Sequence, residues 1–192
     1  MADAPSDRHT GHPDASVSIV FAAACCEAFA NEIGYVAREQ QSLPTAIKAL
    51  GEVLEEMEAA PVQAKFLLMR RLLGGIAFDK GANPYQDFAL LIALRNELIH
   101  RKAESYDLDA NMEPLTTISL LAKLRSKNIL AEPDPGGSRI WSFFLSIETR
   151  AVATWAVETA KAIINDIADV APRDFRVQLQ ARCAPILGMP KV

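Results

Sequence analysis

The chain has 192 residues and a formal net charge of −4, and half of its residues are hydrophobic. This composition is typical of a globular domain that can bury a real core, and it excludes an intrinsically disordered chain. Proteins that coat nucleic acid usually carry a basic excess, so any nucleic-acid contact made by this acidic chain has to come from a local patch.

The cysteine content and the hydropathy pattern indicate the compartment. The three cysteines are Cys25, Cys26 and Cys183, an odd and small number that predicts no disulfide framework and a reducing cytoplasm. We expect Cys25 and Cys26 to be small core residues rather than reactive thiols. No run reaches about 18 apolar residues and no basic segment precedes an apolar one near the start, so we expect neither a membrane span nor a secretion signal.

The first 15 residues are polar and contain Pro5, Gly11 and Pro13, which predicts a disordered tail. His9 and His12 lie in this tail. Two histidines with no further ligand nearby favour a solvated segment over a metal site.

Helical spacing of apolar residues begins at Ser16 and predicts a first helix to about Gln40. Pro44 ends this pattern and suits the first turn of a second helix, Thr45 to Ala59. A third helix is expected from Pro61 to Leu73, where the pair Gly74-Gly75 would end it.

The second half of the chain alternates apolar stretches with breakers. The expected elements are a loop at 78–84, a helix from Tyr85 to Lys102, a turn at 105–111, a helix from Glu113-Pro114 to about Ser126, a loop at 132–138, a long helix from Trp141 to Val170, and an irregular C-terminal extension at 171–192. Residues 16–170 are therefore predicted to form one all-α antiparallel bundle of five to six helices.

A charged residue interrupts the apolar face of the helix at 85–102. A helical wheel places Arg95 in the middle of a face formed by Phe88, Leu91, Ile92, Leu98 and Ile99. A buried guanidinium without a partner costs several kcal/mol. We therefore expect Arg95 to pair with a carboxylate inside the bundle or to face a polar cleft.

Asn96 and His100 are four residues apart on this helix and share a face. Ala89 and Ala93 precede them on that face and leave room for another helix or a substrate. His100 is the only histidine outside the tail, and imidazole exchanges a proton near neutral pH, as a general acid or base must. The alternative for His100 alone is an ordinary residue at a helix end.

Arg95-Asn96-x-x-x-His100 resembles the R-x4-H motif, with Asn after the Arg, of HEPN domains (higher eukaryotes and prokaryotes nucleotide-binding). The stretch Asn83 to Phe88 introduces the motif as in such proteins. Glu27-Ala28-Phe29-x-Asn31-Glu32 is similar to a pattern of small bacterial members, and residues 153–160 look like their terminal helix. The resemblance covers roughly Ser16 to Val170.

The resemblance implies a dimeric helical bundle that cleaves single-stranded RNA without a metal or another cofactor, in a toxin or phage-defence setting. Arg95, Asn96 and His100 would be catalytic, in a composite site formed by two copies of the chain. Arg101 and Lys102 would contact RNA, and an antitoxin protein stays open as a further partner.

Glu27 and Asn31 are also four apart, on one face of the otherwise apolar first helix. We expect Glu27 to approach Arg95 and hold its side chain, with Asn31 in support. A core ion pair without a chemical role is an equal alternative.

Two other functions fit the same residues. The chain could be a non-catalytic HEPN-like module that binds a nucleotide, a nucleic-acid end or a protein, which suits its acidic charge. It could also be a plain helical scaffold or immunity partner, in which Arg95 is structural.

Overall fold

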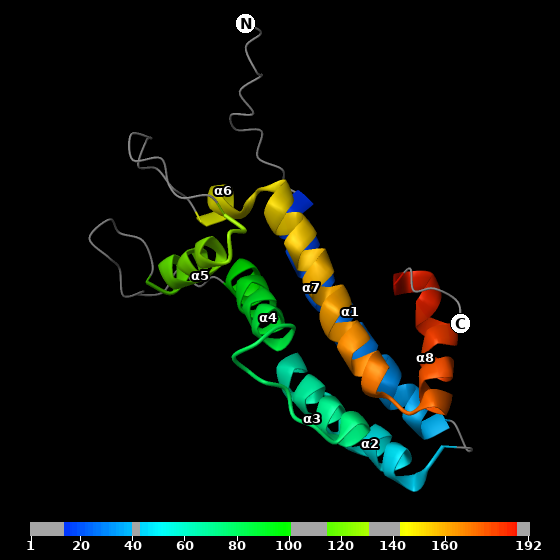
Figure 1. The fold of residues 1–192 in the computed structure, drawn as a ribbon. Coiled ribbons are helices and arrows are strands. Elements are labelled where there is room, and N and C mark those ends of the chain that lie inside the picture. The colour runs from blue at the N-terminus through cyan, green and yellow to red at the C-terminus, as the bar shows by residue number, and fades with distance from the viewer. Residues whose placement is uncertain (1–13, 40–42, 101–114, 131–142, 188–192) are drawn as a thin grey trace, which may run out of the picture. The chain divides into compact units, whose positions relative to one another are not determined.

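Helices make up the regular structure in the part of the chain that the computed structural model describes, which is residues 14–39, 43–100, 115–130 and 143–187. In chain order they are α1 (Asp14–Glu39), α2 (Thr45–Glu56), α3 (Val62–Gly74), α4 (Tyr85–His100), α5 (Leu115–Ser126), α6 (Phe143–Ile147), α7 (Arg150–Val170) and α8 (Arg173–Leu187) (Figure 1). The predicted all-α bundle is confirmed.

The breakers in the first half of the chain act as predicted. The carbonyl oxygen of Pro44 accepts hydrogen bonds from the amides of Ile47 and Lys48, at 2.9 and 3.2 Å, and so starts α2. Gly75 ends α3 in the left-handed conformation, with φ 70°, and its amide donates to the carbonyl of Arg71 at 3.0 Å. Glycine adopts this conformation without steric cost.

Several predicted segments lie outside the described residues. They are the tail as far as residue 13 with His9 and His12, Arg101 and Lys102, the turn at 105–111, the start of the fifth predicted helix at 113–114, the loop at 132–138, and Trp141. Asp14 and Ala15, assigned to the tail from the sequence, already belong to α1, and Ala15 is fully buried. The first helix therefore begins before Ser16.

The predicted helix from Trp141 to Val170 is not continuous. α6 ends at Ile147 and α7 begins at Arg150. Between them, the hydroxyl of Thr149 accepts a hydrogen bond from the amide of Val152 at 3.2 Å. A threonine hydroxyl that accepts the free N–H two or three positions into a helix starts a new helix at that point.

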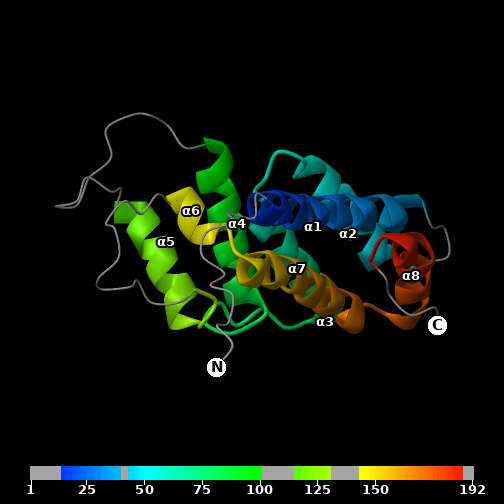
Figure 2. The same ribbon diagram turned by 90° about the horizontal axis from the view of Figure 1, so that it is seen from above.

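The C-terminal extension is also more regular than predicted. The amide of Arg176 donates to the carbonyl of Pro172 at 2.8 Å, and α8 follows. Phe175 and Leu179 of α8 are buried, while Arg182 pairs with Glu32 of α1 at 3.1 Å. The backbone of α8 lies beside the C-terminal end of α1 (Figure 2). Burial of this apolar face overrides the prolines that suggested an irregular segment.

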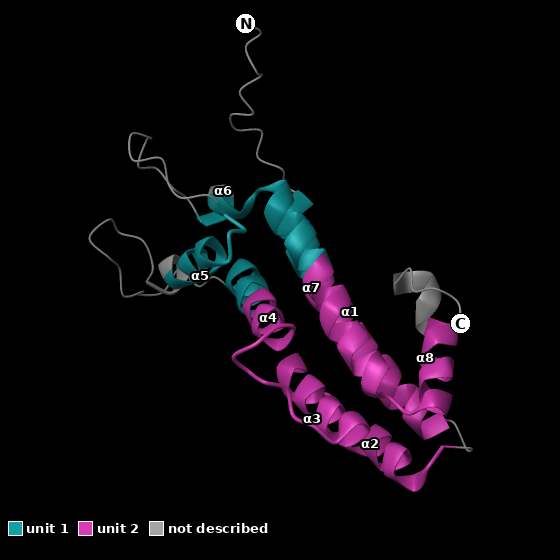
Figure 3. Ribbon diagram, in the orientation of Figure 1, with its two compact units in different colours: residues 1–20, 93–157 teal, residues 21–92, 158–192 magenta. Residues whose placement is uncertain are grey.

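The chain divides into two compact units, a division that the sequence pattern did not indicate. Unit 1 contains residues 1–20 and 93–157, and unit 2 contains residues 21–92 and 158–192 (Figure 3). α1, α4 and α7 each contribute residues to both units.

An aromatic cluster forms the centre of unit 2. Phe66 of α3 lies 4.7 Å, between ring centroids, from Phe88 of α4 and 6.2 Å from Phe29 of α1. Tyr85 continues the cluster, 6.0 Å from Phe88 and 5.2 Å from Phe78. Tilted and edge-on rings at these separations attract one another in addition to the apolar area that they bury.

Unit 1 has its own apolar core. Its fully buried large side chains include Leu94 of α4, Leu124 of α5, and Phe143 and Ile147 of α6. The hydroxyl of Ser16 donates a short hydrogen bond to the carboxylate of Glu148, which joins the start of α1 to the segment between α6 and α7.

By length and composition, α1 meets the hydropathy criterion for a membrane span, contrary to our expectation from the sequence. An 18-residue window of α1 has a mean hydropathy of 1.4, and 44% of it is buried in this structure. The core helix of a globular bundle passes the same test.

Two glycines allow α1 and α2 of unit 2 to cross closely. A Cβ atom at Gly51 would lie 2.7 Å from Cγ of Arg38 and 2.9 Å from the carbonyl oxygen of Gly34. A Cβ at Gly34 would lie 3.3 Å from Cβ of Leu54. The crossing therefore depends on the missing side chain at position 51.

Gly51→Ala should lower the free energy of unfolding by about 1–3 kcal/mol, because the added methyl group forces the two helices apart. Urea denaturation checks this value. Gly81→Ala is the control, since a Cβ there would meet only the Asp79 carboxylate at 3.4 Å. Equal stability of Gly51→Ala and the parent chain would contradict the close crossing.

A charged pair joins α3 to α7 within unit 2. Nε of Arg70 lies 3.0 Å from the carboxylate of Asp166, and the Arg70 guanidinium lies 5.5 Å from the centre of the Phe78 ring. The pair is an ion contact without hydrogen-bond geometry. Burial raises the pKa of the Asp166 carboxyl above its ordinary value, although the Arg70 guanidinium acts in the opposite direction.

A raised pKa in the folded state favours the protonated carboxyl, so the stability that Asp166 contributes is complete below the unfolded pKa and is lost as the pH rises through the folded value. We therefore expect the free energy of unfolding of the parent chain, minus that of Asp166→Asn, to fall as the pH rises above about 4, the ordinary pKa of an aspartate. Urea titrations at each pH measure this difference. The exposed Glu52→Gln shows how much of the trend comes from losing a surface charge, and a difference that grows with pH would contradict the assignment.

Candidate functional site

The Arg-Asn-His motif lies in the last turns of α4, within unit 1. The first half of α4 belongs to unit 2, where Tyr85 and Phe88 are buried in the aromatic cluster. Because α4 runs without a break from Tyr85 to His100, helical geometry alone sets the spacing of the three motif side chains along its surface.

The apolar face of α4 differs from the prediction. Phe88, Leu91 and Ile92 are buried as expected, and Leu98 is half-buried, but Ile99 is 47% exposed. Leu90 and Leu94, which the wheel did not include, are both buried. The helix is thus covered on more than one side near its middle and becomes exposed toward its end.

Arg95 is half-buried rather than enclosed in the core. Its Nη1 donates a hydrogen bond to the side-chain oxygen of Asn96 at 3.1 Å. Because the amide oxygen accepts this bond, the NH2 group of Asn96 is left to donate to another group. The structure therefore brings two of the three motif side chains into direct contact.

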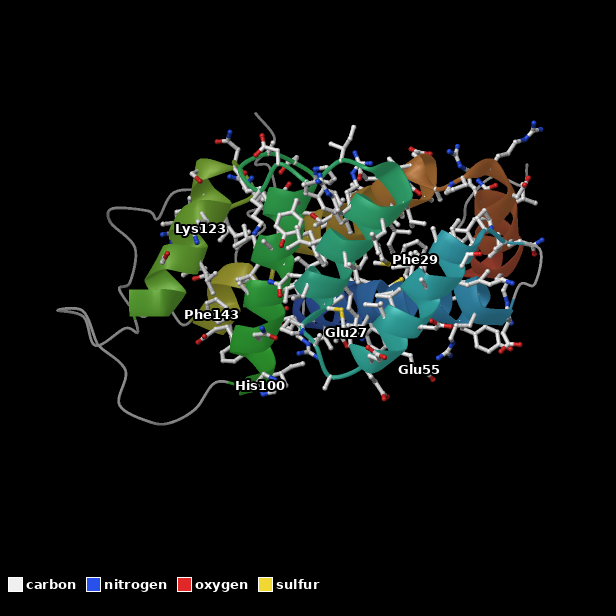
Figure 4. All side chains as sticks on the ribbon, turned by 90° about the horizontal axis from the view of Figure 1, so that it is seen from below. Glu27, Phe29, Glu55, His100, Lys123 and Phe143 are labelled. Atoms are coloured by element: carbon white, nitrogen blue, oxygen red, sulfur yellow. The ribbon has the colours of Figure 1, made fainter. Side chains whose placement is uncertain are left out.

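His100 is the last residue of α4 and is exposed (Figure 4). Asn96 is exposed too, one turn earlier, and residues four apart on a helix are surface neighbours. Asn96 thus touches Arg95 and lies beside the position of His100 along the helix. The end of α4 presents an amide and an imidazole to solvent, and a guanidinium contacts the amide.

The first-helix residues singled out from the sequence, Glu27 and Asn31, belong to unit 2. The predicted approach of Glu27 to Arg95, which is in unit 1, stays a prediction. Asn31 has a partner that the sequence did not suggest, because Nζ of Lys65 donates to its side-chain oxygen at 3.3 Å.

Lys65 is the polar residue that sequence reasoning missed. It is only 7% exposed and lies on the buried face of α3 with Val62, Phe66 and Met69. Its Nζ also donates to the carbonyl oxygen of Glu58 at 3.0 Å. A charge inside an apolar stripe was the signal used for Arg95, and the same signal at position 65 could have identified it.

The two cysteines of α1 have core-like surroundings. Cys26 is fully buried, and burial raises the pKa of its thiol strongly. Cys25 is half-buried, and burial raises its pKa as well. Because the thiolate is the reactive form, a raised pKa lowers the reactivity of both thiols. Cys26 is the core residue that the sequence predicted, whereas Cys25 is only half-buried.

Within the described ranges, no group of three or more histidine, cysteine, aspartate or glutamate side chains is arranged to hold a metal ion. The polar groups at the end of α4 are an amide, a guanidinium and an imidazole. Such groups can bind an anion by hydrogen bonding and move a proton.

Comparison with family models, curated proteins and solved structures finds no match to this chain.

His100→Ala should change the free energy of unfolding by no more than about 0.5 kcal/mol, because the side chain is exposed at the end of a helix. Leu94→Ala, on the same helix and fully buried, should cost about 2–5 kcal/mol. Thermal and urea unfolding of both variants test this contrast. A large loss of stability in His100→Ala would indicate a structural role for the imidazole.

Proposed function

We propose that this chain is a metal-independent endoribonuclease of the HEPN type, with Arg95, Asn96 and His100 as its catalytic residues. The observation that carries the proposal is the hydrogen bond from Arg95 to Asn96, one helical turn before the exposed His100. These are the three positions of the motif that resembles the family's R-x4-H pattern. Their side chains supply an anion-binding group and a proton carrier at one helix end.

RNA contains its own nucleophile, the ribose 2′-hydroxyl, so the enzyme has only to activate it and stabilise the reacting phosphate. His100 would accept the proton of the 2′-hydroxyl as its oxygen attacks the phosphorus atom. The bond from phosphorus to the 5′-oxygen then breaks, and that oxygen takes up a proton. The products are a 2′,3′-cyclic phosphate and a 5′-hydroxyl.

Arg95 would hold the scissile phosphate and neutralise the negative charge that builds up during the attack. A guanidinium group has five N–H donors in a planar fork that matches the oxygens of a phosphate. Asn96 would fix the direction of the guanidinium and donate its own N–H groups to the phosphate or to the ring of His100.

One imidazole cannot be both the base and the acid of a concerted step. Two copies of the chain, related by a two-fold axis that brings their α4 ends together, would supply a second His100. The small side chains of Ala89 and Ala93 on α4 suit such a contact. We therefore propose a homodimer with a composite site, acting in a toxin or phage-defence setting, with single-stranded RNA as the substrate.

The purified protein should cleave a fluorescently labelled single-stranded RNA in the presence of EDTA. His100→Ala should lower the rate by about 10²–10⁴-fold, because a general acid or base contributes that much. Arg95→Ala should lower it by about 10²–10³-fold through loss of charge stabilisation. Gel analysis of the cleavage, with mass spectrometry of the new ends, measures both the rates and the predicted cyclic phosphate.

Lys123→Ala is the matched control, since Lys123 is an exposed cation of α5 in the same unit (Figure 4). It should cleave RNA as the parent does. A substrate with 2′-deoxyribose at the cleaved position should stay intact, and the active sample should sediment at twice the 20.9 kDa chain mass. Intact RNA with the parent protein would exclude the enzyme and favour a binding module.

A further inference from the structure

A cavity of about 270 Å³ opens between α1 and α2, entirely within unit 2. Polar side chains from both helices and from the turn after α2 line it, together with the two glycines of the helix crossing. These polar side chains include Asn31, Arg38, Glu55 and Glu58. None of these residues belongs to the Arg-Asn-His motif.

The close helix crossing shapes this cavity. Gly34 and Gly51 bring the backbones together, and the stem of Arg38 passes over the position where a side chain at 51 would stand. The guanidinium of Arg38 then forms an ion pair with the carboxylate of Glu55 across the crossing. That pair occupies one end of the guanidinium and leaves further N–H donors on the cavity wall.

A buried cation sets the orientation of Asn31. Lys65 is 7% exposed, and its ammonium donates to the side-chain oxygen of Asn31 at 3.3 Å and to the carbonyl oxygen of Glu58 at 3.0 Å. Since an ammonium group can only donate, the amide oxygen of Asn31 faces Lys65 and its NH2 group is left for the cavity. Asn31 and Arg38 thus provide hydrogen-bond donors on the α1 side of the cavity.

The buried ammonium group also lacks a charged partner among the described residues. The two acceptors of its hydrogen bonds, in Asn31 and Glu58, are neutral oxygens. A buried lysine is rarely found without a carboxylate partner. Lys65 does not line the cavity, but its ammonium group lies behind the Asn31 amide and favours an anion on the cavity side of that amide.

The opposite wall carries negative charge. Glu58 lines the cavity, and within the described part of the chain its carboxylate forms no ion pair, because Lys65 binds only its backbone oxygen. Glu55 lies beside it, with a side chain that is 66% exposed (Figure 4). Because Arg38 and Glu55 compensate each other, the charges without an opposite partner among the described residues are the Glu58 carboxylate and the Lys65 ammonium behind Asn31. A ligand with only one sign of charge would be repelled by one of these two groups.

We propose that this cavity binds a free α-amino acid. Its carboxylate would accept hydrogen bonds from Asn31 and Arg38, and its ammonium group would donate to Glu58. A zwitterion has a carboxylate for the hydrogen-bond donors on one side of the cavity and an ammonium group for the carboxylate on the other. A volume of about 270 Å³ lies below the range typical of pockets for drug-sized ligands, which suits a ligand as small as an amino acid. Amino-acid binding here and RNA cleavage at α4 can each fail without the other.

The test is isothermal titration of the full chain with each proteinogenic amino acid in turn, followed by derivatives of the tightest binder. The N-acetyl derivative lacks the ammonium charge and the carboxamide derivative lacks the carboxylate. Each should bind at least about tenfold more weakly, because a charge-assisted hydrogen bond is lost. Absence of binding by every amino acid at millimolar concentration, or equal binding of the derivatives, would overturn the proposal.

Two variants connect the binding to these residues. Glu58→Gln should weaken binding at least about tenfold, whereas Glu52→Gln, which removes an exposed carboxylate of α2 outside the cavity lining, should not. Asn31→Asp should give Lys65 a carboxylate partner and raise the melting temperature while abolishing binding. Loss of binding in both glutamate variants alike, or unchanged binding in Asn31→Asp, would show that the ligand lies elsewhere.

Discussion

Contact between phenyl rings on three helices is the interaction on which unit 2 depends. Phe66 is fully buried and touches Phe29 of α1 on one side and Phe88 of α4 on the other. Each aromatic ring buries on the order of 150–250 Å² of apolar surface, more than an aliphatic side chain contributes. The cluster holds the first half of α4, and the unbroken helix carries the Arg-Asn-His motif onward into unit 1.

Within one copy of the chain, the proposed chemistry uses side chains of a single helix, α4. Neighbouring residues along α4 place a guanidinium against an amide, and helical periodicity places the amide beside the imidazole. Such a constellation is small, and it lies at a helix end where side chains reach solvent. A second copy of the chain would add a second imidazole and exclude water, which is why the proposed enzyme is a dimer.

Charged side chains inside unit 2 are held in two different ways. Arg70 meets a carboxylate and an aromatic ring, and the cost of burying that carboxylate appears as the raised pKa of Asp166. Lys65 meets only an amide oxygen and a backbone oxygen. A buried ion with neutral partners can still gain from an added anion, whereas a buried ion pair cannot. Lys65, next to the cavity lined by Asn31, therefore differs from Arg70 in having no carboxylate partner among the described residues.

The sequence by itself determined the helical class, most helix boundaries in the first half and the motif on α4. These depend on local chemistry: apolar spacing, the proline before α2, the glycine after α3, and residues four apart on one helix. The tertiary structure alone decided the helix after Pro172, the division into two units and the pairing of Lys65 with Asn31. These result from packing or hydrogen bonding between residues far apart in the chain, which local patterns do not encode. The break at Thr149 is a local N-cap, three residues from its partner Val152, and the sequence analysis missed it because the apolar spacing continues through it.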